Sequence, residues 1–426
     1  LYMLAGGMIL VFVLFVLVAD LCDRGKAAWG RALVCIVWYV ALIYLYRQLF
    51  ARQYPLGTLY MAGEFFRFPR AYPYSLAIVP LFAWLTPLFC FAVSRSGRRK
   101  GAALRQCVYG AVSLVLLAAG IGTLANWEKE EILGYNYFTR MQKWDAVLAK
   151  ADKRAPDTPL SVAALNLALA EREYLPDFMF HYFQNGPEGL LPSFRKEYIV
   201  CAMAGEIYWR LGMVNTAQRY VFEGMETLPN YDKSVRSIQR LVETNLINER
   251  YEVAAKYIAM LKQTWFYRRW AQEAEMYLYQ TEKIAQHPTW GKLRSELLTE
   301  DFFFSEQEKD MMMGLLYQSD TLNRMAYEYL MGMTLVTKNL TRFMDYYNLQ
   351  PTLPQAAPTS YQEAMALIWR QRGSKPEERP VGLEDRTIAA LNAFMNMYQQ
   401  SKNPAQALYP SFGQTYWYYV MFRYNQ

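Results

Sequence analysis

Hydrophobic residues are spread unevenly along the 426-residue chain. Four apolar runs lie in the first 125 residues, and no run of similar length follows them. Each run is close to the ~20 residues that a helix needs to cross roughly 30 Å of hydrocarbon, and none carries a charge at its centre. The pattern therefore predicts four transmembrane helices, over residues 1–18, 32–49, 74–93 and 108–125.

Basic residues between the runs predict the orientation. The first link holds Arg24, Lys26 and Arg31, and the short third link, residues 94–107, holds five more basic residues. Because cytoplasmic links are enriched in Lys and Arg, we expect both links in the cytoplasm. The loop 50–73 and everything after residue 125 are then expected on the outer side of the membrane. That side is the periplasm or the cell exterior.

The start of the chain lies inside an apolar run. Leu1 comes first, without the basic segment and small-residue cleavage site of a signal peptide. We therefore interpret residues 1–18 as a membrane helix and expect further membrane helices before it.

The formal charge of +7 comes from the membrane region. Residues 1–126 contain twelve Lys and Arg against three acids, whereas the remainder has a net charge of −2. The basic excess thus follows membrane topology and does not indicate a phosphate-binding surface, which argues against nucleic-acid binding.

Candidate chemistry is sparse. Cys201 is the single cysteine after residue 125, so no disulfide can form within that region. His181 and His287 lie far apart in sequence and lack partners at metal-ligand spacing. No glycine-rich phosphate loop, nucleophile elbow or HExxH motif occurs. We expect no catalytic residue, no metal and no cofactor, and a non-enzymatic role is the favoured interpretation.

After residue 125, apolar residues recur every three or four positions, and Pro, Gly and Asn divide the segments. This predicts an all-α fold in which helix pairs stack as a tetratricopeptide-like α-solenoid over residues 126–349. The clearest repeat spans 201–229. Its small, aromatic and proline positions are Gly205, Tyr208, Gly212, Ala217, Gly224 and Pro229. Small residues allow two helices to approach closely, and glycine or proline ends each helix.

Residues 350–426 predict a C-terminal helical cap interrupted by loops. The segment 350–358 holds three prolines, and the segment 416–424 holds six aromatic residues. The aromatic tail is interpreted as a packing element. The alternative is an exposed platform on which sugars or peptides stack.

The loop 50–73 is the candidate site for lipid contact. Arginines among aromatic residues at a membrane surface can hold a phosphate, as in a polyprenyl-phosphate sugar donor. The alternative is an interfacial loop anchored by its aromatic rings. The polar candidates are Arg52, Glu64, Arg67 and Arg70.

The membrane block, the repeat unit and the tail sequence TYWYY at Thr415–Tyr419 resemble an uncharacterised family of polytopic membrane proteins from Bacteroidetes. Stretches such as Ala326–Leu330 and Lys338–Phe343 contribute to the resemblance. It implies a multi-pass protein of a bacterial inner membrane and transfers no activity. The similarity to tetratricopeptide repeats implies protein or peptide binding.

Three functional hypotheses follow. The first is an inner-membrane scaffold whose periplasmic solenoid binds a protein or peptide in a groove that includes Glu206 and Arg210. The second is an accessory part of a membrane glycosyltransferase or envelope polymer-handling protein, with its catalytic segment in preceding helices and a glycan or polyprenyl-phosphate ligand. The third is a subunit of a larger envelope complex.

Overall fold

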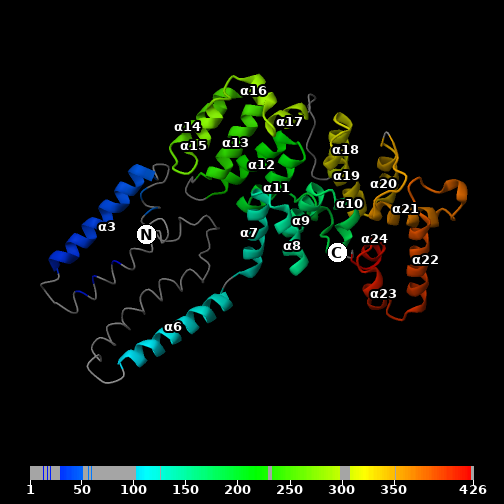
Figure 1. The fold of residues 1–426 in the computed structure, drawn as a ribbon, viewed down its shortest axis with the longest axis horizontal. Helices are drawn as coiled ribbons and strands as arrows, with labels where there is room; N and C mark the ends of the chain where they lie inside the picture. Colours follow the sequence, from blue (N-terminus) through cyan, green and yellow to red (C-terminus); the bar gives the residue numbers. More distant parts are fainter. Residues whose placement is uncertain are drawn as a thin grey trace. The chain divides into compact units, whose positions relative to one another are not determined.

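The computed structural model describes residues 13, 17, 20, 29–50, 56, 59, 102–124, 126–228, 233–297, 308–350 and 352–423 (Figure 1). All regular elements among these residues are helices. The all-α prediction is therefore confirmed for the described part of the chain. The outer-loop candidates Arg52, Glu64, Arg67 and Arg70, and Pro229 of the predicted repeat, lie outside it.

The chain divides into two compact units. The first comprises Leu1–Trp127, Met225–Val242 and Tyr251–Leu278, and the second comprises Glu128–Gly224, Glu243–Arg250 and Tyr279–Gln426. The described part of the predicted cap thus belongs to the same unit as most of the predicted repeats. The predicted boundary at residue 350 stays a prediction.

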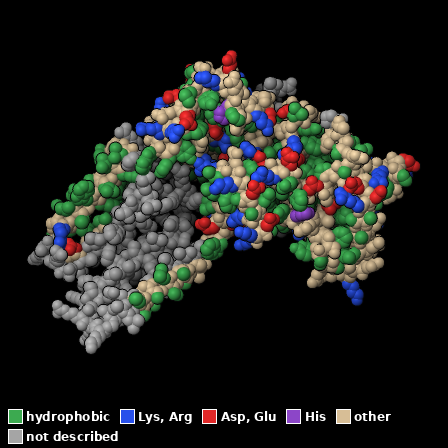
Figure 2. All heavy atoms as spheres, viewed as in Figure 1, with side chains coloured by type: hydrophobic (Ala, Val, Ile, Leu, Met, Phe, Trp, Pro, Cys, Tyr) green, Lys and Arg blue, Asp and Glu red, His purple; other side chains and the backbone are tan. Residues whose placement is uncertain are grey.

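The first unit contains two long apolar helices, α3 (Trp29–Phe50) and α6 (Ala102–Leu124), and the pair α14 (Tyr251–Lys262) and α15 (Arg268–Glu275). Apolar side chains are exposed along α3, including Leu33 and Trp38 at 67% each. Figure 2 shows hydrophobic side chains along this helix, with charged ones near its end. Ala32, Tyr39 and Ile43 of the same helix are buried. An apolar helix that exposes most of its side chains is suited to lipid.

One helix among the described residues, α3 over Trp29–Leu49, is long and apolar enough to cross a membrane. Its position near the N-terminus also fits a signal sequence. The fourth predicted span coincides with much of α6, and the spans at 1–18 and 74–93 lie outside the described residues except for positions 13 and 17. Four membrane spans therefore stay a prediction.

The second unit is built from shorter helices. Up to residue 250 they are α7 (Trp127–Arg140), α8 (Trp144–Lys153), α9 (Pro159–Glu171), α10 (Leu175–Phe178), η3 (Met179–His181), η4 (Gly186–Gly189), α11 (Tyr198–Arg210) and α12 (Val214–Glu226), whose end belongs to the first unit. The next helix, α13 (Val235–Ile247), begins in the first unit and ends in the second. Then follow α16 (Thr281–Gln286), α17 (Trp290–Ser295), α18 (Lys309–Ser319), α19 (Arg324–Val336), α20 (Leu340–Tyr347), α21 (Thr359–Gln371), η6 (Pro376–Glu378), α22 (Asp385–Gln400), α23 (Pro404–Phe412), α24 (Tyr416–Tyr418) and the π-helical turn η7 (Tyr419–Arg423).

The core of the second unit is formed around α9 and α19. Ten consecutive residues of α9 and eleven of α19 are buried. The two helices contact each other, and both contact α10 and η4. Their N-termini are capped by side chains, since Thr158 accepts a hydrogen bond from the Ser161 amide and Asn323 accepts one from the Ala326 amide. Segments far apart in sequence thus share one core.

The helices α11 and α12 approach closely through glycine. A methyl group added to Gly224 would lie 2.6 Å from Cys201 Cβ, and one added to Gly205 would lie 3.0 Å from Val221 Cγ2. Tetratricopeptide repeats usually have a large aromatic at the position of Cys201. Here Cys201 is fully buried opposite Gly224 of α12.

The turn between α11 and α12 depends on a left-handed residue. Gly212 has φ +91°, a conformation that favours glycine. Tyr208 and Ala217 are fully buried, and the Tyr208 ring packs 5.0 Å from that of Tyr220. The hairpin has the compact geometry of one helical repeat, and a continuous solenoid stays a prediction.

The aromatic tail is a packing element. Tyr416, Trp417, Tyr418 and Tyr419 are between 0% and 8% exposed. The Trp417 indole nitrogen donates to the Glu363 carbonyl at 2.8 Å, and the Tyr419 hydroxyl donates to the Val336 carbonyl at 2.9 Å. Because these rings are inaccessible, the alternative interpretation as an exposed stacking platform is wrong for them.

Candidate functional site

The strongest candidate site in the second unit is an aromatic surface on α10 and η3. This segment is four residues of α-helix followed by one 3-10 turn, so its side chains divide sharply between two sides. Leu175, Pro176, Met179 and Phe180 are buried. Tyr174 and Phe178 are 49% and 42% exposed. We call Tyr174, Phe178 and His181 the aromatic patch.

The rings of the aromatic patch pack edge to face. The Tyr174 and Phe178 centroids are 5.6 Å apart, and those of Phe178 and His181 are 4.9 Å apart. Burial lowers the pKa of His181, an effect that the nearby Asp177 carboxylate opposes. Burial thus disfavours the charged form of the imidazole, which suits a patch made of aromatic rings.

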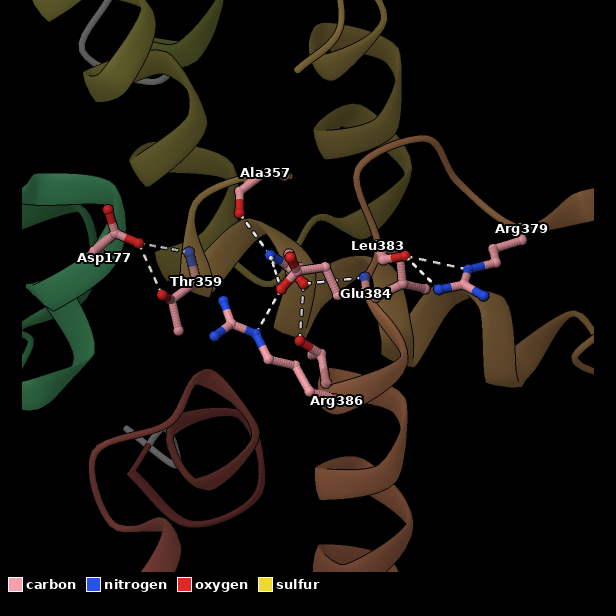
Figure 3. A network of polar contacts seen from close by, with 9 residues as sticks. Asp177, Ala357, Thr359, Arg379, Leu383, Glu384 and Arg386 are labelled. Carbon is pink, nitrogen blue, oxygen red and sulfur yellow. Dashed lines mark hydrogen bonds and ion pairs between the residues drawn. The ribbon is translucent and has the colours of Figure 1, made fainter. Parts of the chain in front are cut away.

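Hydrogen bonds fix α10 to α21. The Asp177 carboxylate accepts from the Thr359 amide at 2.7 Å and from the Thr359 hydroxyl at 2.8 Å, as Figure 3 shows. The Ser360 hydroxyl donates to the Pro176 carbonyl. A carboxylate at the N-terminus of α21 is stabilised by the amides and dipole of that helix. These contacts connect the segment that carries the patch to a helix 182 positions later in the sequence.

A second polar cluster in Figure 3 joins α21 to the start of α22. Gln362 makes most of its hydrogen bonds, and its amide nitrogen donates to the Ala357 carbonyl at 2.7 Å. Its side-chain oxygen accepts from the Glu384 amide at 3.1 Å and the Thr387 hydroxyl at 2.8 Å. The Arg386 guanidinium pairs with the Glu384 carboxylate. These polar groups form hydrogen bonds and an ion pair with one another. The cluster therefore connects α21 to α22 and does not offer an open ligand site.

Two buried glutamates lie in the same part of the unit. Burial raises the pKa of Glu328 to about 7, although its partner Arg324 opposes the shift. Burial raises the pKa of Glu363 to about 8, and a hydrogen bond from the Tyr416 amide opposes it. Perturbed acids often mark functional sites. Here no group of three or more His, Cys, Asp or Glu among the described residues could hold a metal ion.

The predicted groove residues lie on α11, and nine of its thirteen residues are buried. The Arg210 guanidinium donates to Glu171 Oε2 at 2.9 Å and lies 5.5 Å from the Trp144 ring. Glu206 is partly exposed on the same helix. Arg210 therefore connects α11 to α9, and most of the apolar surface of α11 is used in packing.

Comparison with known proteins gives a family without an assigned activity. The model of a family of unknown function (DUF6057) matches residues 1–423. The chain belongs to this family. No curated protein and no solved structure matches it. The expected resemblance to an uncharacterised family is thus supported at this level, and its Bacteroidetes source, membrane topology and repeats stay predictions.

The aromatic patch was missed by the sequence interpretation. The signal was present, because the segment 174–183 contains five aromatic residues and one histidine. Tyr174 and Phe178 are four residues apart, so a helix places them side by side. The exposure of each ring depends on packing against helices that are distant in sequence. The sequence pattern does not show this packing.

Proposed function

We propose that the protein is a membrane-anchored docking scaffold. Its helix α3 spans a bacterial inner membrane, and its second unit binds a partner protein on the periplasmic side. The observation that carries the proposal is the aromatic patch, in which Tyr174 and Phe178 are exposed and His181 is partly exposed. No cofactor is needed for this role.

The membrane anchor is supported by the exposure of α3. Leaving Leu33, Trp38 and Leu45, which are 57–67% exposed, in water would cost about 25 cal/mol for each Å² of apolar surface. Lipid removes this cost. The basic links that flank the apolar runs support a cytoplasmic N-terminal end and a periplasmic C-terminal end of α3.

Protein binding is supported by the chemistry of the patch. Exposed aromatic rings bury a large area at low cost in side-chain entropy and dominate many interfaces. The patch is also held in place by the contacts of Asp177 with Thr359, so little ordering is needed on binding. We propose that the ligand of the aromatic patch is an apolar segment of a partner protein.

The solenoid groove at Glu206 and Arg210 is the second docking proposal. Because Arg210 already bonds Glu171, a ligand there would meet an ion pair rather than a lone cation. The aromatic patch offers more accessible apolar surface, and we therefore favour it.

Site-specific photocrosslinking tests the assignment. A photoreactive phenylalanine analogue is placed at position 178, at 206, or at Leu322, which is 89% exposed and serves as control. We expect a discrete crosslinked partner from position 178 that disappears with Tyr174→Ser and none from position 322. A crosslink from 206 alone would move the docking site to the groove, and equal crosslinks from 178 and 322 would refute a specific patch.

A further inference from the structure

In the first unit, a cavity lies between the C-terminal end of α3 and the pair α14–α15. Its volume is ≈ 440 Å³. Among the described residues, the lining contains two cationic side chains, three amide side chains and no carboxylate. These residues are Gln48, Leu49, Lys262, Gln263, Arg268 and Gln272. Cations and amide donors without a lining acid are suited to an anionic ligand.

The two cations differ in their bonding. Lys262 Nζ lies 2.9–3.0 Å from both carboxylate oxygens of Glu275, so its charge is partly compensated. Arg268 Nε donates to the Lys262 carbonyl at 3.1 Å. This bond orients the guanidinium, whose two terminal nitrogens carry the remaining donors. A guanidinium with this geometry can hold a phosphate with two parallel hydrogen bonds.

Two exposed aromatic rings follow α14 directly. Trp265 and Phe266 are 59% and 78% exposed, and their rings stack with centroids 5.6 Å apart. They stand between Lys262 and Arg268 in sequence. Aromatic rings beside basic residues are typical of segments that lie at the boundary between hydrocarbon and lipid headgroups.

The position of the cavity relative to the membrane follows from α3. Leu49 lines the cavity and is also the last residue of the stretch that could span a membrane. If α3 spans the bilayer, as proposed above, the cavity lies where the hydrocarbon ends and the phosphates begin.

We infer that this cavity binds the phosphate of an anionic phospholipid, with Arg268 as the main contact and Lys262 as a supporting cation. Trp265 and Phe266 enter the interface beside it. The site anchors the α14–α15 pair to the membrane surface, and it extends the proposed function from a single anchoring helix to a lipid-binding face.

Native mass spectrometry of the full chain, released from detergent micelles containing phosphatidylglycerol, tests this inference. We expect wild type to retain phosphatidylglycerol and Arg268→Gln to retain it about tenfold more weakly, because a charge-assisted bond is lost. Arg268→Lys should recover part of the binding. Arg269→Gln is the matched control, since Arg269 does not line the cavity.

Three results would overturn the inference. They are equal retention by wild type and Arg268→Gln, equal loss in Arg269→Gln, or displacement of the lipid by inorganic phosphate, which would indicate a site for a free anion. Circular dichroism confirms that each variant is folded. Carbonate extraction of membranes tests α3 separately, because Arg268→Gln stays in the membrane fraction if α3 spans the bilayer.

Discussion

The helices α3 and α9 have the same kind of sequence and opposite surroundings. Both are apolar around their whole circumference. In α9 ten residues are buried by protein, whereas in α3 the side chains of Leu33, Val37 and Leu45 are 57–67% exposed. Their lengths also differ, at 13 and 22 residues. The 13 residues of α9 suit a protein core, and the 22 residues of α3 are long enough for the membrane span that we propose.

Polar groups show the same contrast. Within α9, the Asn166 amide nitrogen donates to Gln184 at 2.8 Å and to the Gly189 carbonyl at 2.7 Å, so a buried polar side chain is satisfied by protein. In α3, the charged residues stand near the ends, where Arg31 pairs with Asp20 at 2.9 Å. A bilayer would offer no such partners at its centre, and the uncharged middle of α3 is compatible with the membrane span that we propose for it.

A matched pair of aspartates tests this contrast most strongly. Leu167→Asp places a charge in the fully buried centre of α9, and we expect it to destabilise the second unit by more than about 4 kcal/mol. Val40→Asp, at the middle of α3, should leave the second unit folded and oppose membrane insertion by about 3 kcal/mol. Chemical unfolding in detergent and the membrane-bound fraction measure the two effects.

The opposite pattern would break the comparison. If Val40→Asp unfolds the second unit while membrane association persists, α3 is a core helix rather than a membrane anchor. If Leu167→Asp is tolerated, the burial of α9 is not what stabilises the unit.

The sequence predicted the helices and missed most of their contacts. The three- and four-residue spacing and the apolar runs are local, and they indicated an all-α fold and the helix α3. The bond between Asp177 and Thr359 joins positions 182 residues apart, and no local pattern reports it. Arg210 was assigned to a groove because of its place in a repeat. The structure adds its pairing with Glu171, 39 residues away, which no local pattern reports, and the groove stays a prediction.

Buried glutamates should make the second unit less stable at high pH. The pKa of Glu363 is about 8 in the folded protein against a usual value of 4.5, because the carboxyl is buried. Between these values the folded state holds a proton that the unfolded state has lost. The unfolding free energy therefore falls by up to about 1.4 kcal/mol for each pH unit as pH rises to about 8.

The variant Glu363→Gln should flatten this dependence, since the amide oxygen still accepts the Tyr416 amide and carries no charge. Glu328→Gln is the companion variant, because burial raises the pKa of Glu328 to about 7 and its removal affects a lower range of pH. Urea unfolding at several pH values gives the slopes. Slopes identical to wild type in both variants would show that neither carboxyl is protonated in the folded state.

Glycines give the smallest expected effects in the comparison between a closely packed helix and an exposed one. Gly224 of α12 and Gly110 of α6 both lie inside helices, where alanine is intrinsically favoured by roughly 0.8–1.0 kcal/mol. A methyl group at Gly224 would lie 2.6 Å from Cys201 Cβ, whereas at Gly110 it would meet nothing within 4 Å. Gly224→Ala should therefore destabilise by about 1–3 kcal/mol despite its better helix propensity. Gly110→Ala should be neutral or stabilising.

Thermal unfolding in detergent measures the stability of both variants, and the double variant Gly224→Ala with Cys201→Gly identifies the cause of the loss. Removing the Cys201 side chain should restore part of the lost stability if the collision with Cβ is responsible, and no recovery would place the strain elsewhere in the hairpin.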